Sequence, residues 1–373
     1  MKKKAMKKKA IFVLGKWSKT GGLEIVTQQF VGVFKKAGYD VTVLSVGSRG
    51  RNESTLNFRV FYMLPPGRIL QSLWHRFLKY RVVARYLRKL VSPGDMVVFG
   101  HVYLLPVLDH CALPDGVTSW VWTHDKEVWG ESAIKWKPWL DKLSRVISVS
   151  EYTAKNARAG GTTTPVTVVP NSIDVRRYVP TVTPEKIRRD EIMICSRIPA
   201  DFRYKGHERL LKTIPHIENI LGRRITLRVV GGGAGLDELK QLARKYGVSD
   251  RVIFTGRVSD DELLEAYQHC GVFCMPSTGE GFGLVYAEAE ACARPVVVST
   301  YGGAPETVKD GETGLLADPI DIQANARALA KILGDKSLAD EMGRKGRLFA
   351  EKVFSPEMFE RNVRKLIKED GQG

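Results

Sequence analysis

Short apolar runs of four to six residues recur along this chain, and most are followed by glycine or polar residues and then by a helical stretch. The first runs lie at residues 10–15, 41–46 and 59–63, with a helix expected over residues 23–36. Strands that alternate with helices predict parallel sheets with crossover helices. Further strands of the same kind are expected at residues 96–99, 118–122, 145–149 and 166–169.

A proline-rich, strand-poor segment interrupts this pattern, and we place a linker at about residues 175–190. The alternation then restarts, with strands expected at residues 191–196, 226–230, 252–255, 272–275 and 295–299, and mostly helix from Ile320 on. A length of 373 residues suits two domains. We predict two α/β, Rossmann-like domains facing each other across a cleft, with ligands at the carboxyl ends of the strands. The predicted bounds are residues 1–178 and 179–355, and a C-terminal helix at about 356–373 is expected to pack back on the first domain.

The positive charge is confined to the first half of the sequence. Residues 1–180 hold 29 Lys and Arg against 12 Asp and Glu, which accounts for the whole net charge of +17, whereas the remainder holds 29 of each. Such asymmetry predicts that an anionic partner faces the first half: a membrane, a nucleic acid or a phosphorylated acceptor.

Several classes of protein are disfavoured. No apolar run reaches the ~18 residues that cross a bilayer, and the basic residues 1–10 precede no long apolar core with a cleavage site. The five cysteines form no C-x-x-C pair, and Cys270 and Cys274 lack a partner pair for zinc. We therefore expect a cytoplasmic protein with reduced cysteines.

Residues 280–288, EGFGLVYAE, form the most informative motif. Gly281 and Gly283 free the backbone where a helix is expected to start, which favours phosphate binding at the helix N-terminus. Glu280 precedes that helix and Glu288 is expected about two turns into it. One carboxylate can then meet a sugar and the other a ribose diol. The alternatives are that Glu280 is a helix cap and that Glu288 is an exposed helical glutamate. Neither explains why two glutamates flank Gly-Phe-Gly.

Three more loops follow predicted strands of the second domain. Arg197 and Lys205 place a guanidinium and an ammonium where they can bind a diphosphate, although each alone would be read as a surface cation. The glycine run 231–235 permits close approach of a phosphate or sugar, and a tight turn explains it equally well. Residues 300–306, TYGGAPE, form a further flexible loop.

Together these residues resemble the donor site of glycosyltransferase family 4, the group 1 glycosyltransferases, which are retaining, have the GT-B fold and carry an E-x7-E signature. The resemblance covers nearly the whole chain. It implies that Arg197 and Lys205 bind the donor pyrophosphate, that Glu280 contacts the sugar hydroxyls and that Glu288 holds the ribose. The other donor-binding positions that it implies are Gly232, Val258, Gly281, Phe282, Gly283, Leu284 and Val285.

The first half has matching parts. Gly21 and Gly22 open the first helix, where the family places a turn against the acceptor and the donor phosphate. His124 follows a strand and resembles the active-site histidine that contacts the transferred sugar; a lone histidine is otherwise more often structural. His101 is a weaker candidate on the acceptor side. Among departures from the family pattern, Tyr301 is bulkier than the usual small residue and is expected to affect sugar choice.

The sequence contains no Asp-x-Asp motif that would hold a metal on the diphosphate. We therefore expect transfer without a metal or other cofactor, with Arg197, Lys205 and a helix N-terminus stabilising the leaving group. Retention can arise from double displacement or from same-face attack. The family pattern suggests the second, and the residues themselves do not decide.

An amphipathic helix with a basic face is predicted over residues 69–90. Its apolar positions are Leu70, Leu73, Trp74, Phe77, Ala84, Leu87 and Leu90, and its basic ones are Arg76, Lys79, Arg81, Arg85, Arg88 and Lys89. Such a helix either binds a membrane surface or packs in the core with a solvated basic face. Trp129, Trp136 and Trp139 are likewise either interfacial anchors or core residues.

The predicted enzyme moves a hexose-type sugar from a UDP- or GDP-linked donor to a membrane-associated glycan or lipid acceptor, as in lipopolysaccharide, exopolysaccharide or glycolipid synthesis. It is expected to bind peripherally to the inner face of the cytoplasmic membrane. The alternatives are another GT-B enzyme, either an inverting transferase or a nucleotide-sugar epimerase, and a basic nucleic-acid-binding protein. The sequence contains no RNP motif or zinc finger, so nucleic acid is not an expected partner.

Overall fold

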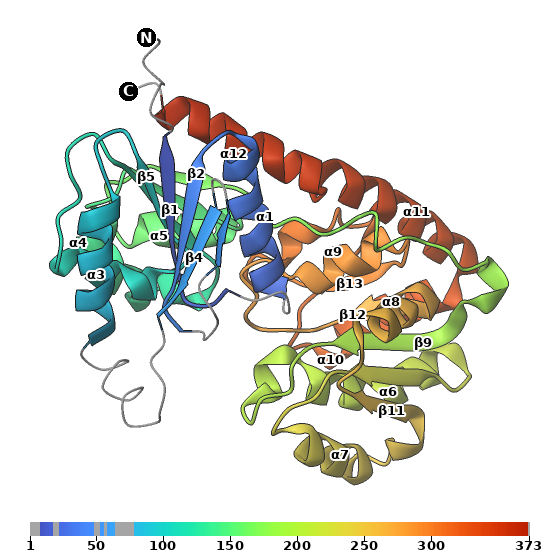
Figure 1. Cartoon of the computed structure of the whole chain (residues 1–373). Coiled ribbons are helices and arrows are strands. Elements are labelled where there is room, and N and C mark those ends of the chain that lie inside the picture. The colour runs from blue at the N-terminus through green and yellow to red at the C-terminus, as the bar shows by residue number, and fades with distance from the viewer. Residues whose placement is uncertain (1–7, 18–21, 48–52, 56–57, 64–77, 372–373) are drawn as a thin grey trace. The chain divides into compact units, whose positions relative to one another are not determined.

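The computed structural model in Figure 1 describes the chain except for residues 1–7, 18–21, 48–52, 56–57, 64–77 and 372–373. The chain divides into two compact units. Unit 1 comprises Met1–Asn171 together with Phe359–Gly373, and unit 2 comprises Ser172–Met358. The last helix, α12 (Pro356–Asp370), therefore belongs largely to unit 1, although it follows unit 2 in the sequence.

Unit 1 contains an eight-stranded sheet in the order β3-β4-β2-β1-β5-β6-β7-β8. Neighbouring strands are parallel except β3 and β4, which are antiparallel. The strands are β1 (Lys9–Leu14), β2 (Asp40–Ser45), β3 (Glu53–Thr55), β4 (Phe58–Tyr62), β5 (Met96–Phe99), β6 (Thr118–Thr123), β7 (Arg145–Ser148) and β8 (Val166–Val168). The helices are α1 (Gly22–Lys36), α3 (Lys79–Leu90), α4 (Glu131–Leu140), α5 (Glu151–Ala159) and the 3-10 segments η2 (Val102–Asp109) and η3 (Lys126–Val128).

Alternate residues of the central strand β1 build the two cores of unit 1, because successive strand residues point to opposite faces. Phe12 packs edge-on against Phe30 and Phe34 of α1, with ring centroids 5.8 and 5.1 Å apart. Ile11 and Val13 join the other core, which includes buried side chains of α3, η2 and α4. Helix α12 is fixed to this unit by Asp370, whose carboxylate accepts hydrogen bonds from Trp120 Nε1 at 2.7 Å and Arg145 Nε at 2.8 Å.

Unit 2 is built on an entirely parallel sheet in the order β11-β10-β9-β12-β13-β14. Its strands are β9 (Arg188–Cys195), β10 (Thr226–Val230), β11 (Val252–Gly256), β12 (Cys270–Cys274), β13 (Val296–Ser299) and β14 (Gly314–Ala317). Its longer helices are α6 (His207–Leu221), α7 (Leu236–Lys245), α8 (Asp260–His269), α9 (Leu284–Ala291), α10 (Ile322–Gly334) and α11 (Lys336–Val353). Short 3-10 segments are η4 (Pro184–Lys186), η5 (Phe202–Lys205), η6 (Ser249–Arg251) and η7 (Ala304–Thr307).

The predicted alternation of strands and helices, and the two parallel, Rossmann-like sheets, are confirmed. Two strands were not predicted. β3 is only three residues long, and β14, with the sequence GLLA, contains none of the β-branched or aromatic residues that favour strands. Of the helix predicted over residues 69–90, the structure shows α3, and residues 64–77 lie outside the described part of the chain. Val83, Ala84 and Leu87 of α3 are buried, so one face of the helix packs in the core, while Arg81, Arg85 and Arg88 are exposed on the other. Membrane binding by this basic face stays a prediction.

Candidate active site

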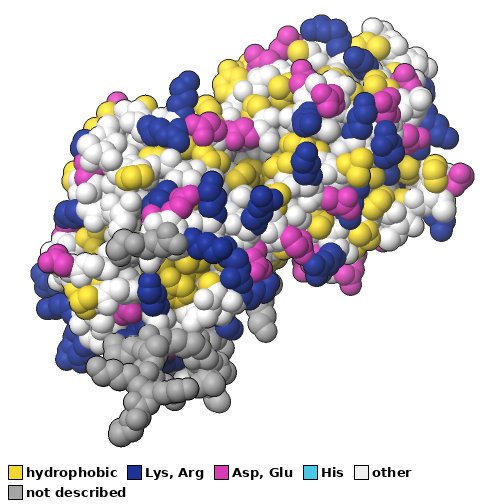
Figure 2. Space-filling view, turned by 90° about the horizontal axis from the view of Figure 1, so that it is seen from above, with side chains coloured by type: hydrophobic (Ala, Val, Ile, Leu, Met, Phe, Trp, Pro, Cys, Tyr) yellow, Lys and Arg dark blue, Asp and Glu magenta, His cyan; other side chains and the backbone are white. Residues whose placement is uncertain are grey.

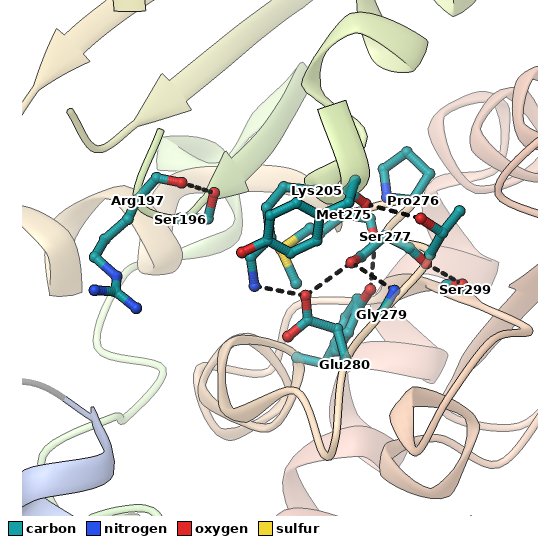
Figure 3. Close-up of polar contacts among 12 residues, drawn as sticks. Ser196, Arg197, Lys205, Met275, Pro276, Ser277, Gly279, Glu280 and Ser299 are labelled. Carbon is teal, nitrogen blue, oxygen red and sulfur yellow. Dashed lines mark hydrogen bonds and ion pairs between the residues drawn. The ribbon is translucent and has the colours of Figure 1, made fainter. Parts of the chain in front are cut away.

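Glu280 lies in the loop between β12 and α9, at the carboxyl edge of the unit 2 sheet, and its carboxylate is held by two donors (Figure 3). Lys205 Nζ donates to Glu280 Oε1 at 2.7 Å, and Ser277 Oγ donates to the same oxygen at 2.8 Å. The side chain of Glu280 is 12% exposed and that of Lys205 is 18% exposed. Charged groups that are this far removed from water and paired hold a defined geometry, which suits recognition of a polar ligand.

The backbone around Glu280 packs tightly against the loop that follows β13. Gly303 N donates to Glu280 O at 2.8 Å. Gly302 has φ +72°, and a Cβ at this position would lie 2.4 Å from Glu280 O. Only glycine therefore allows the two loops to approach so closely. The glycine pair in residues 300–306 thus supports Glu280 structurally.

Helix α9 begins at Leu284, and Gly283 precedes it with φ +96°. Glu288 is the fifth residue of α9, so it lies about one turn into the helix rather than the predicted two. The reason is that the Gly-Phe-Gly segment forms a bent loop, with Gly283 in the left-handed conformation, instead of the first helical turn. The backbone N–H groups of Leu284 and Val285 lie in the first turn of α9, where an α-helix leaves N–H groups unpaired.

The carboxylate of Glu288 accepts hydrogen bonds from two tyrosines of the same unit. Tyr267 Oη donates to Glu288 Oε2 at 2.8 Å, and Tyr178 forms a further hydrogen bond to this carboxylate. Burial raises the pKa of the Glu288 carboxyl, and the tyrosine hydrogen bonds partly offset that rise. Glu288 is therefore not the freely exposed helical glutamate of the alternative interpretation.

Arg197 differs from Lys205 in its surroundings. It lies just beyond the end of β9, its side chain is exposed, and its guanidinium has no ion-pair partner among the described residues. In Figure 3 the side chain extends away from the Lys205–Glu280 pair. Arg197 is therefore available to an anionic ligand, whereas Lys205 already has a carboxylate partner.

The glycine run after β10 and the residues after β11 are adjacent. Gly231 N donates to Gly256 O at 2.9 Å, and a Cβ on Gly232 would meet Arg257 Cγ at 3.3 Å. Arg257 and Val258 line a cavity of about 240 Å³ together with Thr255. The structure thus brings the predicted positions Gly232 and Val258 to one place in unit 2.

His124 directly follows β6, at the carboxyl edge of the unit 1 sheet. Its Nε2 lies 2.9 Å from Gly100 O, and its backbone N donates to Glu127 Oε1 at 2.5 Å. Burial lowers the pKa of His124 to about 4, although the nearby Glu127 carboxylate opposes this shift. His124 is therefore neutral near pH 7. Its Nε2 carries the proton and donates a hydrogen bond to Gly100 O.

Unit 1 also contains a cavity of about 300 Å³ at the same edge of its sheet. Its walls are apolar at Leu14, Val46 and Leu104. Basic side chains line it at Lys16, Lys79 and His101. Lys16 is paired with Glu24 at 3.4 Å. His101, the weaker candidate, stacks on Tyr103 with centroids 4.4 Å apart.

The remaining predicted positions fall as follows. Gly22 is the first residue of α1, and Gly21 lies outside the described residues. Trp136 is buried in the unit 1 core, so it is not an interfacial anchor, while Trp129 and Trp139 are partly buried. Four cysteines are buried and Cys195 is partly exposed.

None of the described helices combines the length and apolar character required to cross a bilayer. Within the same ranges, no three His, Cys, Asp or Glu side chains gather as metal ligands would.

Reasoning from the sequence missed Ser277, Ser299, Tyr178, Tyr267 and Glu127. The two serines form hydrogen bonds in the loop that carries Glu280. The two tyrosines form hydrogen bonds to the carboxylate of Glu288, and Glu127 accepts a hydrogen bond from the backbone N of His124. Ser277 has a local signal, because it lies three residues before Glu280 in the same loop. The tyrosines have none, because their role depends on how distant segments pack.

Two family descriptions match the chain. Residues 20–177 match Glycosyltransferase Family 4, and residues 185–349 match Glycosyl transferases group 1. A GDP-mannose-dependent alpha-(1-6)-phosphatidylinositol monomannoside mannosyltransferase of Mycolicibacterium smegmatis is 30% identical over 88% of this chain and 90% of its own length. A GDP-mannose-dependent monoacylated alpha-(1-6)-phosphatidylinositol monomannoside mannosyltransferase of Corynebacterium glutamicum is 28% identical over 74% of this chain and 77% of its own.

Solved structures of similar fold cover both units. Sucrose-phosphate synthase from Thermosynechococcus elongatus has a TM-score of 0.79 at 22% identity, covering 97% of this chain and 99% of that one. HepE from Anabaena in complex with UDP has a TM-score of 0.77 at 19% identity, covering 97% of this chain and all of that one. At these identities the similarity establishes the fold alone.

Proposed function

The chain belongs to glycosyltransferase family 4, the group 1 glycosyltransferases, and we propose that it transfers mannose from GDP-mannose to a phosphoinositide-type glycolipid with retention at the anomeric carbon. The observation that carries the proposal is the Lys205–Glu280 pair beside the N-terminus of α9 in a chain of this family. It offers a carboxylate to sugar hydroxyls and cationic groups to a diphosphate.

The donor assignment is supported by two relatives. Both are described as GDP-mannose-dependent, and the first covers nearly the whole length of each chain. In unit 2, Arg197 and Lys205 would bind the diphosphate, and the first-turn amides of α9 would bind its distal phosphate. Glu288 would hold the ribose, with its carboxylate oriented by Tyr178 and Tyr267. The backbone near Gly232 and Val258 would contact the base.

We further propose same-face attack without a metal. The leaving diphosphate gains negative charge as the glycosidic bond breaks, and Arg197, Lys205 and the α9 amides would stabilise that charge in place. The leaving phosphate oxygen would take the acceptor proton. Glu280 would bind the sugar hydroxyls, and His124, neutral near pH 7 with its proton donated to Gly100 O, would accept a hydrogen bond from a sugar hydroxyl without adding charge. Activity that disappears with a chelator and returns with magnesium or manganese would contradict the metal-free proposal.

The acceptor is assigned to unit 1. Its cavity combines apolar walls with the ammonium groups of Lys16 and Lys79, which suit a polyol headgroup that carries a phosphate. Arg81, Arg85 and Arg88 form an exposed basic face on α3, adjacent in sequence to Lys79. We propose that this face binds anionic lipid and brings the cavity to the headgroups. On the face seen in Figure 2, basic and acidic side chains are intermixed, so the surplus charge forms no uninterrupted patch there.

The test is a screen of GDP-mannose, UDP-glucose and other nucleotide sugars for saturable binding by the full chain, followed by product analysis. Incubation with GDP-mannose and phosphatidylinositol vesicles should give a mannosylated lipid, and NMR of the product should show an α-linkage. Saturable binding of a UDP-sugar with no binding of GDP-mannose would replace the donor. A β-linked product would contradict retention.

A further inference from the structure

Two buried serines beside Glu280 form hydrogen bonds whose directions are fixed by their partners. Ser277 is 0% exposed and Ser299 is 1% exposed. Ser277 lies in the loop after β12, and Ser299 is the last residue of β13, the neighbouring strand. Neither touches solvent, so their hydroxyl groups act only through other residues of the chain.

The direction of the Ser277 hydroxyl follows from its neighbours. Gly279 N donates to Ser277 Oγ at 3.3 Å, and an N–H group can only donate. Glu280 Oε1 lies 2.8 Å from Ser277 Oγ, and a carboxylate oxygen can only accept. The Ser277 proton must therefore point at Glu280 Oε1.

The Ser299 hydroxyl is fixed by the same reasoning. Tyr301 N donates to Ser299 Oγ at 3.0 Å, and Ser299 Oγ donates to the carbonyl oxygen of Ser277 at 2.6 Å (Figure 3). Ser299 thereby ties the Ser277 backbone to the end of β13. The same loop also holds Glu280 directly through Gly303.

These bonds leave the two oxygens of Glu280 in different states. Oε1 accepts hydrogen bonds from both Lys205 Nζ and Ser277 Oγ, whereas Oε2 has no hydrogen-bond partner among the residues that the structure describes. A carboxylate held at one oxygen by two donors cannot rotate without losing both bonds. Its second oxygen is thus presented in one direction.

We propose that Ser277 and Ser299 are positioning residues that fix Glu280 so that its Oε2 accepts hydrogen bonds from hydroxyl groups of the donor sugar. Ser277 orients the carboxylate, and Ser299 anchors Ser277. The proposal deepens the assignment of the donor site and rests on the proposed function. Neither serine touches the substrate, so both act through Glu280.

The binding test compares the affinity for GDP-mannose with that for GDP in the full chain. In Ser277→Ala, the extra affinity that the sugar provides should fall about tenfold, and GDP affinity should stay within twofold of wild type. Turnover should fall by about 10²-fold, since small misplacement of a reacting group costs that much. Ser299→Ala should show the same pattern, more weakly.

The matched control is Thr164→Ala in unit 1, because Thr164 is also buried, its hydroxyl donates to Leu140 O at 2.8 Å, and it is remote in sequence from Glu280 and its partners. It should lose stability as the serine variants do, with the sugar-dependent affinity unchanged. In a Glu280→Gln background, Ser277→Ala should produce no further loss of that affinity. Equal loss of GDP and GDP-mannose binding in Ser277→Ala would overturn the inference, because it indicates a merely structural role.

A crystal structure of Ser277→Ala separates this inference from the proposed function. The Glu280 carboxylate should adopt another rotamer or several. An unchanged Glu280 rotamer at Lys205 would overturn the inference whichever donor the chain uses. If the wild-type chain binds no nucleotide sugar, the proposed function fails, and the Glu280 rotamer still decides whether Ser277 positions it.

Discussion

The carboxyl edges of the two sheets are built differently. In unit 2, Lys205, Ser277 and Ser299 surround the Glu280 loop with hydrogen bonds of 2.6–2.8 Å, and the acids and bases of the sequence from residue 181 on are balanced. In unit 1 the carboxyl edge of the sheet carries a cavity of about 300 Å³, and its lysines belong to a half of the sequence with a large surplus of positive charge.

The difference corresponds to what each edge must do. Groups that stabilise charge as a bond breaks are most effective when they are already in place before the reaction. Groups that attract an anionic surface need charge and exposure more than fixed geometry. The contrast predicts that substitutions in unit 2 change turnover steeply, whereas substitutions on the basic face of unit 1 change membrane binding in a graded, salt-dependent way.

The largest effect is expected for Glu280→Gln, which keeps the size of the side chain and removes its charge. Turnover should fall by about 10²–10³-fold, as for the loss of a preorganised electrostatic group. Steady-state kinetics with GDP-mannose and circular dichroism would measure activity and fold. Glu312→Gln is the control, because Glu312 is an exposed glutamate of the same unit. Near wild-type turnover in Glu280→Gln would remove the catalytic contrast between the units.

Within unit 2, Lys205→Met and Arg197→Met should separate two roles. Lys205→Met removes a phosphate-binding charge and an anchor of Glu280, so both GDP affinity and turnover should fall, by roughly 10–100-fold each. Arg197→Met should weaken GDP affinity about tenfold with a smaller loss of turnover, because its side chain is exposed and makes no bond to Glu280. Calorimetry with GDP and initial-rate kinetics test this. Identical profiles for the two variants would contradict it.

In unit 1, the triple variant Arg81→Ser, Arg85→Ser, Arg88→Ser should reduce binding to vesicles rich in anionic lipid. Each basic residue near such a surface contributes about 1 kcal/mol, so we expect a loss of roughly tenfold or more. High salt should weaken wild-type binding, because the Debye length is about 10 Å at 0.1 M. Vesicle sedimentation measures the binding, and GDP affinity should stay unchanged.

The control removes the same charge from unit 2. Lys240, Arg244 and Lys245 lie on α7, and their replacement by serine should leave sedimentation unaffected. If both triple variants lose binding equally, net charge is responsible rather than the α3 face. If neither loses binding, the charge of unit 1 serves another partner, such as a phosphorylated acceptor.

The two edges also differ in how well the sequence predicted them. Glu280, the glycines around it and the start of α9 lie within one short segment, so local spacing was sufficient. The exception was the position of Glu288 in the helix, because Gly283 delays the helix start to Leu284. The serine contacts were missed because Ser299 reaches Ser277 only when β13 pairs with β12.

In unit 1, the sequence predicted the position of His124 and every strand except β3, but not the hydrogen bonds that hold this histidine. Glu127 is three residues away and bonds the backbone of His124, while Gly100 comes from the neighbouring strand end. The amphipathic pattern over residues 69–90 left core and membrane as alternatives. Burial of Val83 and Leu87 places one face of α3 in the core and leaves the role of its basic face to experiment.

The smallest expected effect is a pH dependence of stability that compares one buried histidine from each unit. Burial lowers the pKa of both His124 and His207 to about 4, and the unfolded value is about 6.5. Between these values the unfolded chain binds a proton that the folded chain does not. The stabilising contribution is therefore complete above pH 6.5 and is lost as the pH falls toward 4. Glu288 and Glu290, whose pKa values are raised by burial, act in the opposite direction.

The quantity to measure is accordingly the difference in unfolding free energy between wild type and a histidine variant, from denaturant titrations at pH 7.5, 6.5 and 5. For His207→Gln this difference should be constant from pH 7.5 to 6.5. At pH 5 the wild type should have lost up to about 2 kcal/mol of stability relative to the variant, since one pKa unit corresponds to about 1.4 kcal/mol. The shift should be equally large for His124→Gln, because burial lowers the pKa of both histidines to the same value of about 4. A difference that is independent of pH in both variants would show that neither histidine is held neutral by its fold. A larger shift for His124 would mean that the edge of unit 1 is the more enclosed of the two.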